Sequence, residues 1–300
     1  MAERFKALGH STYGVAAHEF FKPKYGFHQG FDRFDNMIAG LIPHRAITSH
    51  LISDQAVRLI KEHRASSGAK PFFLFVHYFD PHFLYQHHPR FDRTSSYRGE
   101  LKAGMPIRKL LNMRSQFAPE DVEFLIGLHR EEIAYTDYHF GRLLDFLERE
   151  GLSKSTLIVV TADHGEEFME HGWIGHTRTL YDELLHVPLI YVWPGVIPPG
   201  REVDVPVSHI DLMPTLFSFQ PGYKPDPAWV GVSLKEVLLG RGQEIPARDL
   251  FASVDYKSRR GLQDAEQDAV FRDRFKLVHN KAAGSYQLYD YLAPRGEYQD

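Results

Sequence analysis

Polar side chains that could bind a metal ion follow directly after a strand-like run in the middle of the chain. The segment LIVVTADHGEEFMEHGWIGH, residues 157–176, opens with apolar residues and then holds an aspartate, three histidines and three glutamates. Asp163 and His164 come where the apolar run ends, and Gly165 permits a turn that brings both side chains to one ion. Together they make half of a metal site, and further ligands must come from elsewhere. The alternative is a surface loop in which Asp163 caps a turn.

A second group of polar residues follows another apolar run, in PFFLFVHYFDPH at residues 71–82. Pro81 stiffens the turn before His82, which predicts that His82 reaches the edge of the sheet where ligands bind. The other two polar residues have a simpler interpretation, in which His77 lies within the sheet and Asp80 makes a turn. We favour that structural role for His77.

A third group lies in EHGWIGHTRTLYDELLHVPLIYVWPG, residues 170–195, ahead of a further strand-like run. It holds His171, His176, Arg178 and Glu183. A cation among these residues could bind an anionic ester. For Arg178, however, we predict a solvated charge at the end of a helix.

The elements that position these residues alternate between strand-like and helical patterns. Strands are predicted over residues 12–17, 72–78, 157–162 and 189–193. Helices are predicted over residues 2–8, 53–65 and 119–150, with Pro119 in the first turn of the last one. This order predicts an α/β fold, and the continuous apolar strands suit a mostly parallel sheet between helices. The aperiodic segment 83–118 is predicted to be a substrate-facing surface.

The last part of the chain has a different pattern. From about residue 221 it is rich in proline and glycine and then gives short strand-like pieces at residues 249–254, 269–278 and 286–291. These pieces predict a small C-terminal antiparallel β subdomain. The predicted domains are therefore an α/β domain over residues 1–220 and a subdomain over residues 221–300.

Composition restricts the classes of partner. The 300 residues carry 35 basic and 39 acidic side chains, which leaves no positive excess to attract nucleic acid. No apolar run reaches the roughly 20 residues of a membrane span, and the opening residues MAERFKALGH lack the apolar core of a signal peptide. There is no cysteine, which excludes disulfides, thiolate ligands and a cysteine nucleophile from these residues. Compartment and oligomeric state are not predicted.

The polar segments together resemble the sulfatase family of the alkaline-phosphatase superfamily. TADHGE at 161–166 resembles the metal-binding turn of that family, and the segments at 175–195 and 72–82 resemble its neighbouring active-site segments. Weaker likenesses occur in GFHQGFDRFD, VSHIDLMPTL and SYQLYDYLAPRGEYQD. They follow the order of the family along nearly the whole chain. The resemblance implies an alkaline-phosphatase-like fold and metal-dependent hydrolysis of a sulfuric ester.

Carried over residue by residue, the resemblance implies that Asp163 and His164 are metal ligands. It implies that His82 contacts the sulfate or assists the leaving group, and that His176 stands where many relatives have a sulfate-binding lysine. The metal would be a divalent cation, Ca²⁺ by the family pattern. Histidine in place of the usual asparagine at residue 164 leaves Mn²⁺ open. The substrate would be a small-molecule or saccharide sulfate ester.

The chain departs from the family pattern at the nucleophile. The two adjacent metal-binding aspartates and the Cys/Ser-x-Pro-x-Arg motif that yields formylglycine do not occur in it. A two-turn helix at residues 2–8 also opens the chain in the middle of an α/β unit, so the resemblance implies that further residues precede Met1. Two alternatives stay open: hydrolysis of a phosphodiester or phosphonate ester, and an inactive sulfatase-like binding module.

Overall fold

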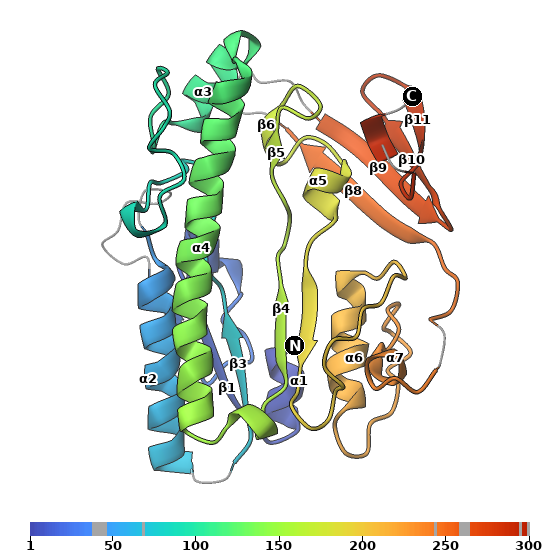
Figure 1. Cartoon of the computed structure of the whole chain (residues 1–300). Helices are drawn as coiled ribbons and strands as arrows, with labels where there is room; N and C mark the ends of the chain where they lie inside the picture. The colour runs from blue at the N-terminus through green and yellow to red at the C-terminus, as the bar shows by residue number, and fades with distance from the viewer. Residues whose placement is uncertain (38–46, 68–69, 243–244, 258–264, 294–295, 299–300) are drawn as a thin grey trace. The chain divides into compact units, whose positions relative to one another are not determined.

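The protein is described here from a computed structural model, which covers residues 1–37, 47–67, 70–242, 245–257, 265–293 and 296–298 (Figure 1). The chain divides into two compact units. Unit 1 comprises residues 1–152 and 168–174, and unit 2 comprises residues 153–167 and 175–300.

Unit 1 is built on a parallel sheet. Its strands are β1 (Ser11–Ala16), β2 (Arg33–Asn36) and β3 (Phe72–Val76), in the order β2-β1-β3. Its helices are α1 (Ala2–Ala7), α2 (Ser49–Ser67), α3 (Ile107–Met113) and α4 (Pro119–Arg149). Short 3-10 turns complete it: η1 (Glu19–Phe21), η2 (Pro23–Tyr25), η3 (Pro89–Phe91) and η4 (Arg114–Gln116).

The core of unit 1 follows from the apolar spacing of its two long helices. Helix α2 packs against β1 and β3 on one side and against α4 on the other, and Figure 1 shows α2 and α4 side by side. Ile52 and Leu59 of α2 and Leu125 and Leu128 of α4 are each at most 1% exposed. They recur at helical spacing, so each helix buries one face and leaves its charged face in water.

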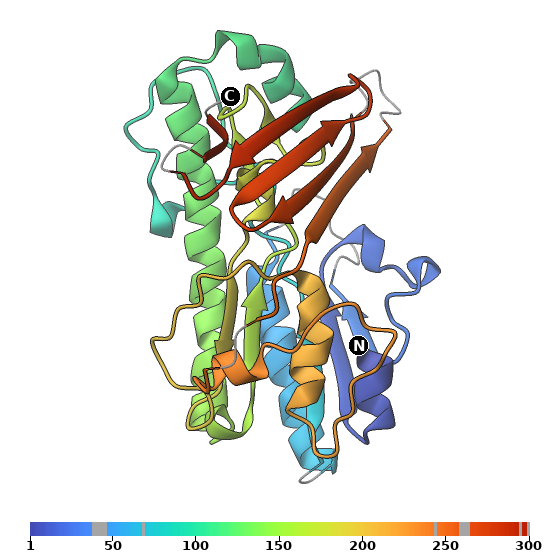
Figure 2. The same ribbon diagram turned by 90° about the vertical axis from the view of Figure 1, so that its right-hand side faces the viewer.

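Unit 2 contains an antiparallel strand pair and a four-stranded antiparallel sheet. The pair is β4 (Ile158–Thr161) with β7 (Leu189–Val192). The sheet has the order β11-β10-β9-β8, from β8 (Leu250–Tyr256), β9 (Ala265–Arg272), β10 (Phe275–Asn280) and β11 (Ser285–Asp290), and is drawn in orange to red in Figure 2. The helices are α5 (Asp182–Leu185), α6 (Leu212–Ser218) and α7 (Lys235–Leu238), with the 3-10 turns η5 (Ser153–Ser155), η6 (His209–Asp211) and η7 (Gly296–Tyr298). The short strands β5 (Glu167–Phe168) and β6 (Ile174–Gly175) span the division between the units.

The predicted strands and helices are mostly present, with four corrections. The single strand predicted at residues 269–278 is wrong, because β9 and β10 are separate strands that turn at Asp273, whose φ is 54°. The turn was missed because the residue with the left-handed backbone conformation is an aspartate, whereas glycine is the usual signal of such a turn. Strands β4 and β7 pair antiparallel rather than parallel. Helix α2 begins at Ser49 rather than Ser53, and α3 occupies part of the segment predicted to be without regular structure.

A fifth correction concerns Arg178. The predicted solvated arginine is only 8% exposed, and its guanidinium lies 5.2 Å from the centroid of the Tyr256 ring. Its charge is therefore held in the protein against an aromatic face. The predicted domain boundary at residue 220 stays a prediction.

A buried lysine ties the C-terminal sheet to α5 within unit 2. Lys276 of β10 is fully buried, with its Nζ 3.1 Å from Asp182 Oδ1 and 2.5 Å from Glu297 Oε1. The backbone N–H of Asp182 donates to Glu297 Oε2 at 2.7 Å. The one ammonium group thus lies between two carboxylates from segments far apart in the sequence.

Candidate functional site

The turn after β4 is held against α5 by its glycine. The N–H of Gly165 donates to the carbonyl of Leu184 at 2.9 Å. A Cβ atom at Gly165 would lie only 1.9 Å from the carbonyl oxygen of Glu183. Only a residue without a side chain permits this approach, so Gly165 fixes where Asp163 and His164 lie.

A hydrogen bond to the backbone fixes the tautomer of His164. Its Nδ1 lies 2.8 Å from the carbonyl oxygen of Gly165, which can only accept a hydrogen bond, so Nδ1 is the donor. In the neutral ring Nε2 then carries the lone pair, and it lies 3.8 Å from Asp163 Oδ2. A cation with bonds of about 2.0–2.5 Å fits between two ligand atoms at that separation. The donor set therefore suits a divalent cation, with other ligands still required.

Exposure of the two side chains agrees with an open site. The side chain of Asp163 is 80% exposed and that of His164 is 35% exposed. The carboxylate is also oriented locally, because Asp163 Oδ1 accepts from the N–H of His164 at 3.1 Å. Asp163 thus combines the turn-capping role and a free second oxygen, so the two interpretations from sequence do not exclude each other.

His176 packs beside His164 and is held by a glutamate. The two imidazole rings have centroids 4.1 Å apart at an interplanar angle of 32°. Nδ1 of His176 lies 3.1 Å from Glu166 Oε2, and the two side chains are 9% and 5% exposed. Unit 2 therefore brings together three of the predicted site residues, Asp163, His164 and His176. Glu166 was missed, because nothing in its spacing distinguishes it from the two neighbouring glutamates.

A further histidine lies at the end of β4. Nε2 of His209 is 3.0 Å from the hydroxyl of Thr161. The neighbouring Asp211 is fully buried, accepts from the N–H of Ser208 and of Val232 at 2.9 Å, and pairs with Arg248. Asp211 is therefore a structural residue that caps the 3-10 turn η6, whereas His209 reaches the end of β4.

His82 lies in unit 1, beyond the end of β3. Its backbone N–H donates to Glu132 Oε2 at 3.3 Å, and its ring stacks on Phe79 with centroids 4.3 Å apart. Nδ1 lies 3.4 Å from the carbonyl oxygen of Phe83. Glu132 also accepts from the N–H of Gln86 at 2.9 Å. A buried carboxylate of α4 therefore fixes the loop that carries His82.

The other polar residues of this segment have structural roles. The ring of His77 packs 4.7 Å from that of Phe21, as its structural interpretation predicts. Asp80 is 6% exposed, and its Oδ2 accepts from the N–H of Thr48 at 2.9 Å and from the N–H and hydroxyl of Ser49 at 2.7 Å. Asp80 is thus the N-terminal cap of α2, supplied from a distant part of the chain.

Removing this cap is expected to destabilise unit 1. The Asp80→Ala substitution leaves two buried N–H groups and a hydroxyl without their acceptor and should lower the free energy of unfolding by about 2 kcal/mol. Urea denaturation followed by circular dichroism measures the effect. Asp137→Ala, on the exposed surface of α4, is the control and should cause little change. Equal stability of the two variants would contradict the capping role.

Two other polar groups of unit 1 are explained by local structure. Ligand atoms of His87, Asp92 and Glu131 lie within 4.8 Å of one another. Glu131, however, already accepts from the N–H of His88 and Arg93, from the hydroxyl of Thr94 and from His87.

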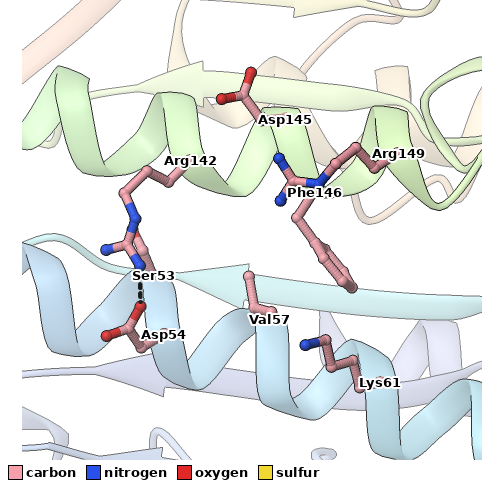
Figure 3. A pocket seen from close by; sticks show the side chains of 8 residues that line it. All are labelled: Ser53, Asp54, Val57, Lys61, Arg142, Asp145, Phe146 and Arg149. Carbon is pink, nitrogen blue, oxygen red and sulfur yellow. Dashed lines mark hydrogen bonds and ion pairs between the residues drawn. The ribbon is translucent and has the colours of Figure 1, made fainter.

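A cavity of about 400 Å³ lies between α2 and α4, where Arg142 pairs with Asp54 at 2.7 Å (Figure 3). None of the predicted site residues lines it.

Comparison with known proteins finds family models and relatives that match this chain. Residues 1–221 match the family model described as Sulfatase, and residues 169–299 match N-sulphoglucosamine sulphohydrolase, C-terminal. The chain is 29% identical over 240 residues to iduronate 2-sulfatase of Homo sapiens, covering 69% of this chain and 42% of that protein. It is 36% identical over 159 residues to N-acetylglucosamine-6-O-sulfatase of Bacteroides thetaiotaomicron, covering 52% of this chain and 28% of that protein. The chain thus spans less than half the length of these relatives.

Solved structures match the fold. A protein in complex with its substrate D-glucosamine-2-N,6-O-disulfate aligns with a TM-score of 0.71 at 19% identity, over 97% of this chain and 74% of that chain. The phosphonate monoester hydrolase of Agrobacterium radiobacter aligns with a TM-score of 0.72 at 20% identity, over 97% of this chain and 73% of that chain. At this level of identity the likeness concerns the fold alone.

Proposed function

Because this chain belongs to the sulfatase family, we propose that it supplies the metal-binding turn and the leaving-group histidine of a sulfuric ester hydrolase. The family and the alkaline-phosphatase-like fold were predicted from the sequence and are confirmed. The observation that carries the proposal is His164, whose Nδ1 is bound to the carbonyl of Gly165 while Nε2 stands 3.8 Å from Asp163. This arrangement leaves one nitrogen and one carboxylate oxygen ready to bind a cation.

The proposed cofactor is a divalent cation, Ca²⁺ by the family pattern, with Mn²⁺ as the alternative that a histidine ligand favours. When bound, it would draw negative charge from the ester oxygens as a Lewis acid. Asp163 and His164 would hold it together with ligands that these two residues do not provide. Their roles, and those of His82 and His176, are part of the proposal.

His176 and His82 would have different roles in the hydrolysis. Glu166 accepts from Nδ1 of His176 and so orients the ring, which would contact a sulfate oxygen. His82 would give a proton to the departing alcohol, which lowers the barrier for a poor leaving group. The proposal requires the nucleophile to come from outside these 300 residues, since they contain no cysteine and no Ser-x-Pro-x-Arg.

The deciding experiment compares the chain with a longer form that includes the formylglycine segment. An aryl sulfate and an aryl phosphodiester are supplied in parallel, with Ca²⁺ or Mn²⁺. Turnover by the longer form, mainly of the sulfate, supports the proposal. Preference for the phosphodiester would favour the fold shared with the phosphonate hydrolase, and no turnover of either would favour a binding module.

Substitution of Asp163 tests the metal site without requiring turnover. Asp163→Ala should weaken the binding of Ca²⁺ or Mn²⁺ at least about tenfold, because one of two anchoring ligands is lost. It should leave stability without metal nearly unchanged, since the side chain is 80% exposed. Isothermal titration with the metal measures this difference, and Asp255→Ala on the exposed face of β8 is the control. Equal affinity of the two variants would remove Asp163 from the site.

A further inference from the structure

A continuous row of rings leads away from His82 within unit 1. The ring of His82 stacks on Phe79 with centroids 4.3 Å apart, and Phe79 stacks on His18 at 4.6 Å. His18 meets Phe20 at 4.7 Å, and Phe20 meets Tyr25 at 5.9 Å, both edge to face. The row therefore joins the end of β3 to the segment after β1, residues 18–27.

This segment exposes its aromatic side chains while fixing their orientation. Phe20, Tyr25 and Phe27 are 56%, 47% and 53% exposed. Each also packs on a neighbouring ring, since Phe27 lies 5.1 Å from Phe21 and Phe20 contacts Tyr25. Each ring thus keeps one part on the protein and offers another to water. Exposed apolar groups gathered in this way are typical of a binding surface.

The same segment carries two lysines. Lys24 places its Nζ 4.7 Å from the centroid of Tyr25, and Lys22 lies 3.7 Å from the carboxylate of Glu19. The segment is anchored at its start, because Asn36 of β2 donates to the carbonyl of His18 at 2.9 Å. The surface combines aromatic faces with a net positive charge. A ligand that suits it has an apolar face and anionic groups.

We propose that Phe20, Tyr25 and Phe27, with Lys22 and Lys24, form a subsite for an anionic oligosaccharide that extends from the hydrolysed ester. A pyranose ring has an apolar C–H face that stacks on an aromatic ring, and its sulfate or carboxylate groups pair with lysine. The inference rests on the proposed function, because His82 would protonate the departing sugar oxygen and so define where the leaving group lies. The segment also follows the carboxyl end of a parallel strand, where α/β folds bind ligands.

A membrane surface is the other partner that aromatic and basic residues suit. It is less favoured, because peripheral membrane segments present a broad apolar face with many basic residues. Here only two lysines occur, one of which is paired with Glu19, and the rings lie against one another. A small aryl sulfate would reach His82 without reaching Phe20 or Tyr25.

Binding tests the subsite without requiring turnover. Isothermal titration of the 300-residue chain with a sulfated hexasaccharide is compared between wild type, the double variant Phe20→Ala/Tyr25→Ala and the control Phe251→Ala. Phe251 is a 75% exposed phenylalanine of β8 in unit 2. The double variant should bind at least about tenfold more weakly, and the control should bind as wild type. Thermal melting verifies that both variants fold.

The outcomes separate the subsite from the proposed function. In the longer form, the double variant should raise KM for the hexasaccharide about tenfold more than KM for an aryl sulfate. Turnover of both substrates with no change in binding or in this ratio would overturn the subsite and leave the proposed function standing. Weakened binding of the hexasaccharide by the double variant, with no turnover by any form, would overturn the proposed function and leave the subsite standing. Loss of binding to phosphatidylserine vesicles, with hexasaccharide affinity unchanged, would overturn the subsite in favour of a membrane surface.

Discussion

Replacing Lys276 by alanine is expected to lower the free energy of unfolding by about 3–5 kcal/mol, because it leaves the buried carboxylate of Glu297 without its cation. Lys276 is fully buried, and its Nζ lies between Asp182 and Glu297. The loss should appear in urea denaturation of the chain. Lys281→Ala is a matched control from the same sheet region, since Lys281 is partly exposed and pairs with Asp268 at 2.9 Å. The control should change stability little.

The pH dependence identifies the cause of this loss. Burial raises the pKa of Glu297, whereas Lys276 lowers it. Removing the ammonium therefore raises that pKa further. A carboxyl whose pKa is raised by folding makes the folded state less stable as pH rises from its unfolded pKa through its folded pKa. The destabilisation by Lys276→Ala should thus be smaller at about pH 5 than at about pH 8. A small loss that is equal at both pH values would contradict the buried pair.

Gly165→Ala is expected to weaken divalent metal binding by about 10–100-fold. Its Cβ would lie 1.9 Å from the carbonyl oxygen of Glu183, so the backbone must move. The movement displaces the carbonyl of Gly165, which fixes the tautomer of His164. Titration with Ca²⁺ and Mn²⁺ measures the affinity, and turnover of an aryl sulfate by the longer form should fall with it.

Gly141 provides the control for this substitution. It lies within α4, and a Cβ there has no atom within 4 Å. Gly141→Ala should leave metal affinity unchanged and raise stability by about 0.5–1 kcal/mol, as expected for alanine in a helix. If Gly165→Ala bound metal as well as Gly141→Ala does, the close approach to α5 would not position the metal site.

Local pattern was enough to find the candidate turn. Asp163 and His164 directly follow an apolar run, and a strand that ends in polar residues is visible without a structure. The same signal found His82 beyond β3. Their roles as metal ligands and proton donor stay predictions. His176 was found in the third polar group, but its role came from the family resemblance, since its position beside His164 depends on the return of the chain.

Contacts between distant segments could not be predicted in this way. Asp80 was predicted to make a turn, although it caps a helix that begins 31 residues earlier at Ser49. The sequence does not mark Lys276 as different from the other lysines, whereas the fold places it between two carboxylates. Glu166 had no distinguishing pattern. In each case the side chain acts on a partner that local periodicity does not identify.

Two consecutive buried glutamates of α4 hold a loop in a way that tolerates substitutions in it. Glu131 and Glu132 bind the loop at residues 82–94 largely through backbone N–H groups, those of His82, Gln86, His88 and Arg93. Every residue type except proline offers the same N–H group. Most side chains of the loop can therefore be exchanged while its path is kept. Descendants of one ancestral chain could in this way acquire new ligand preferences by substitution alone, without rebuilding the fold.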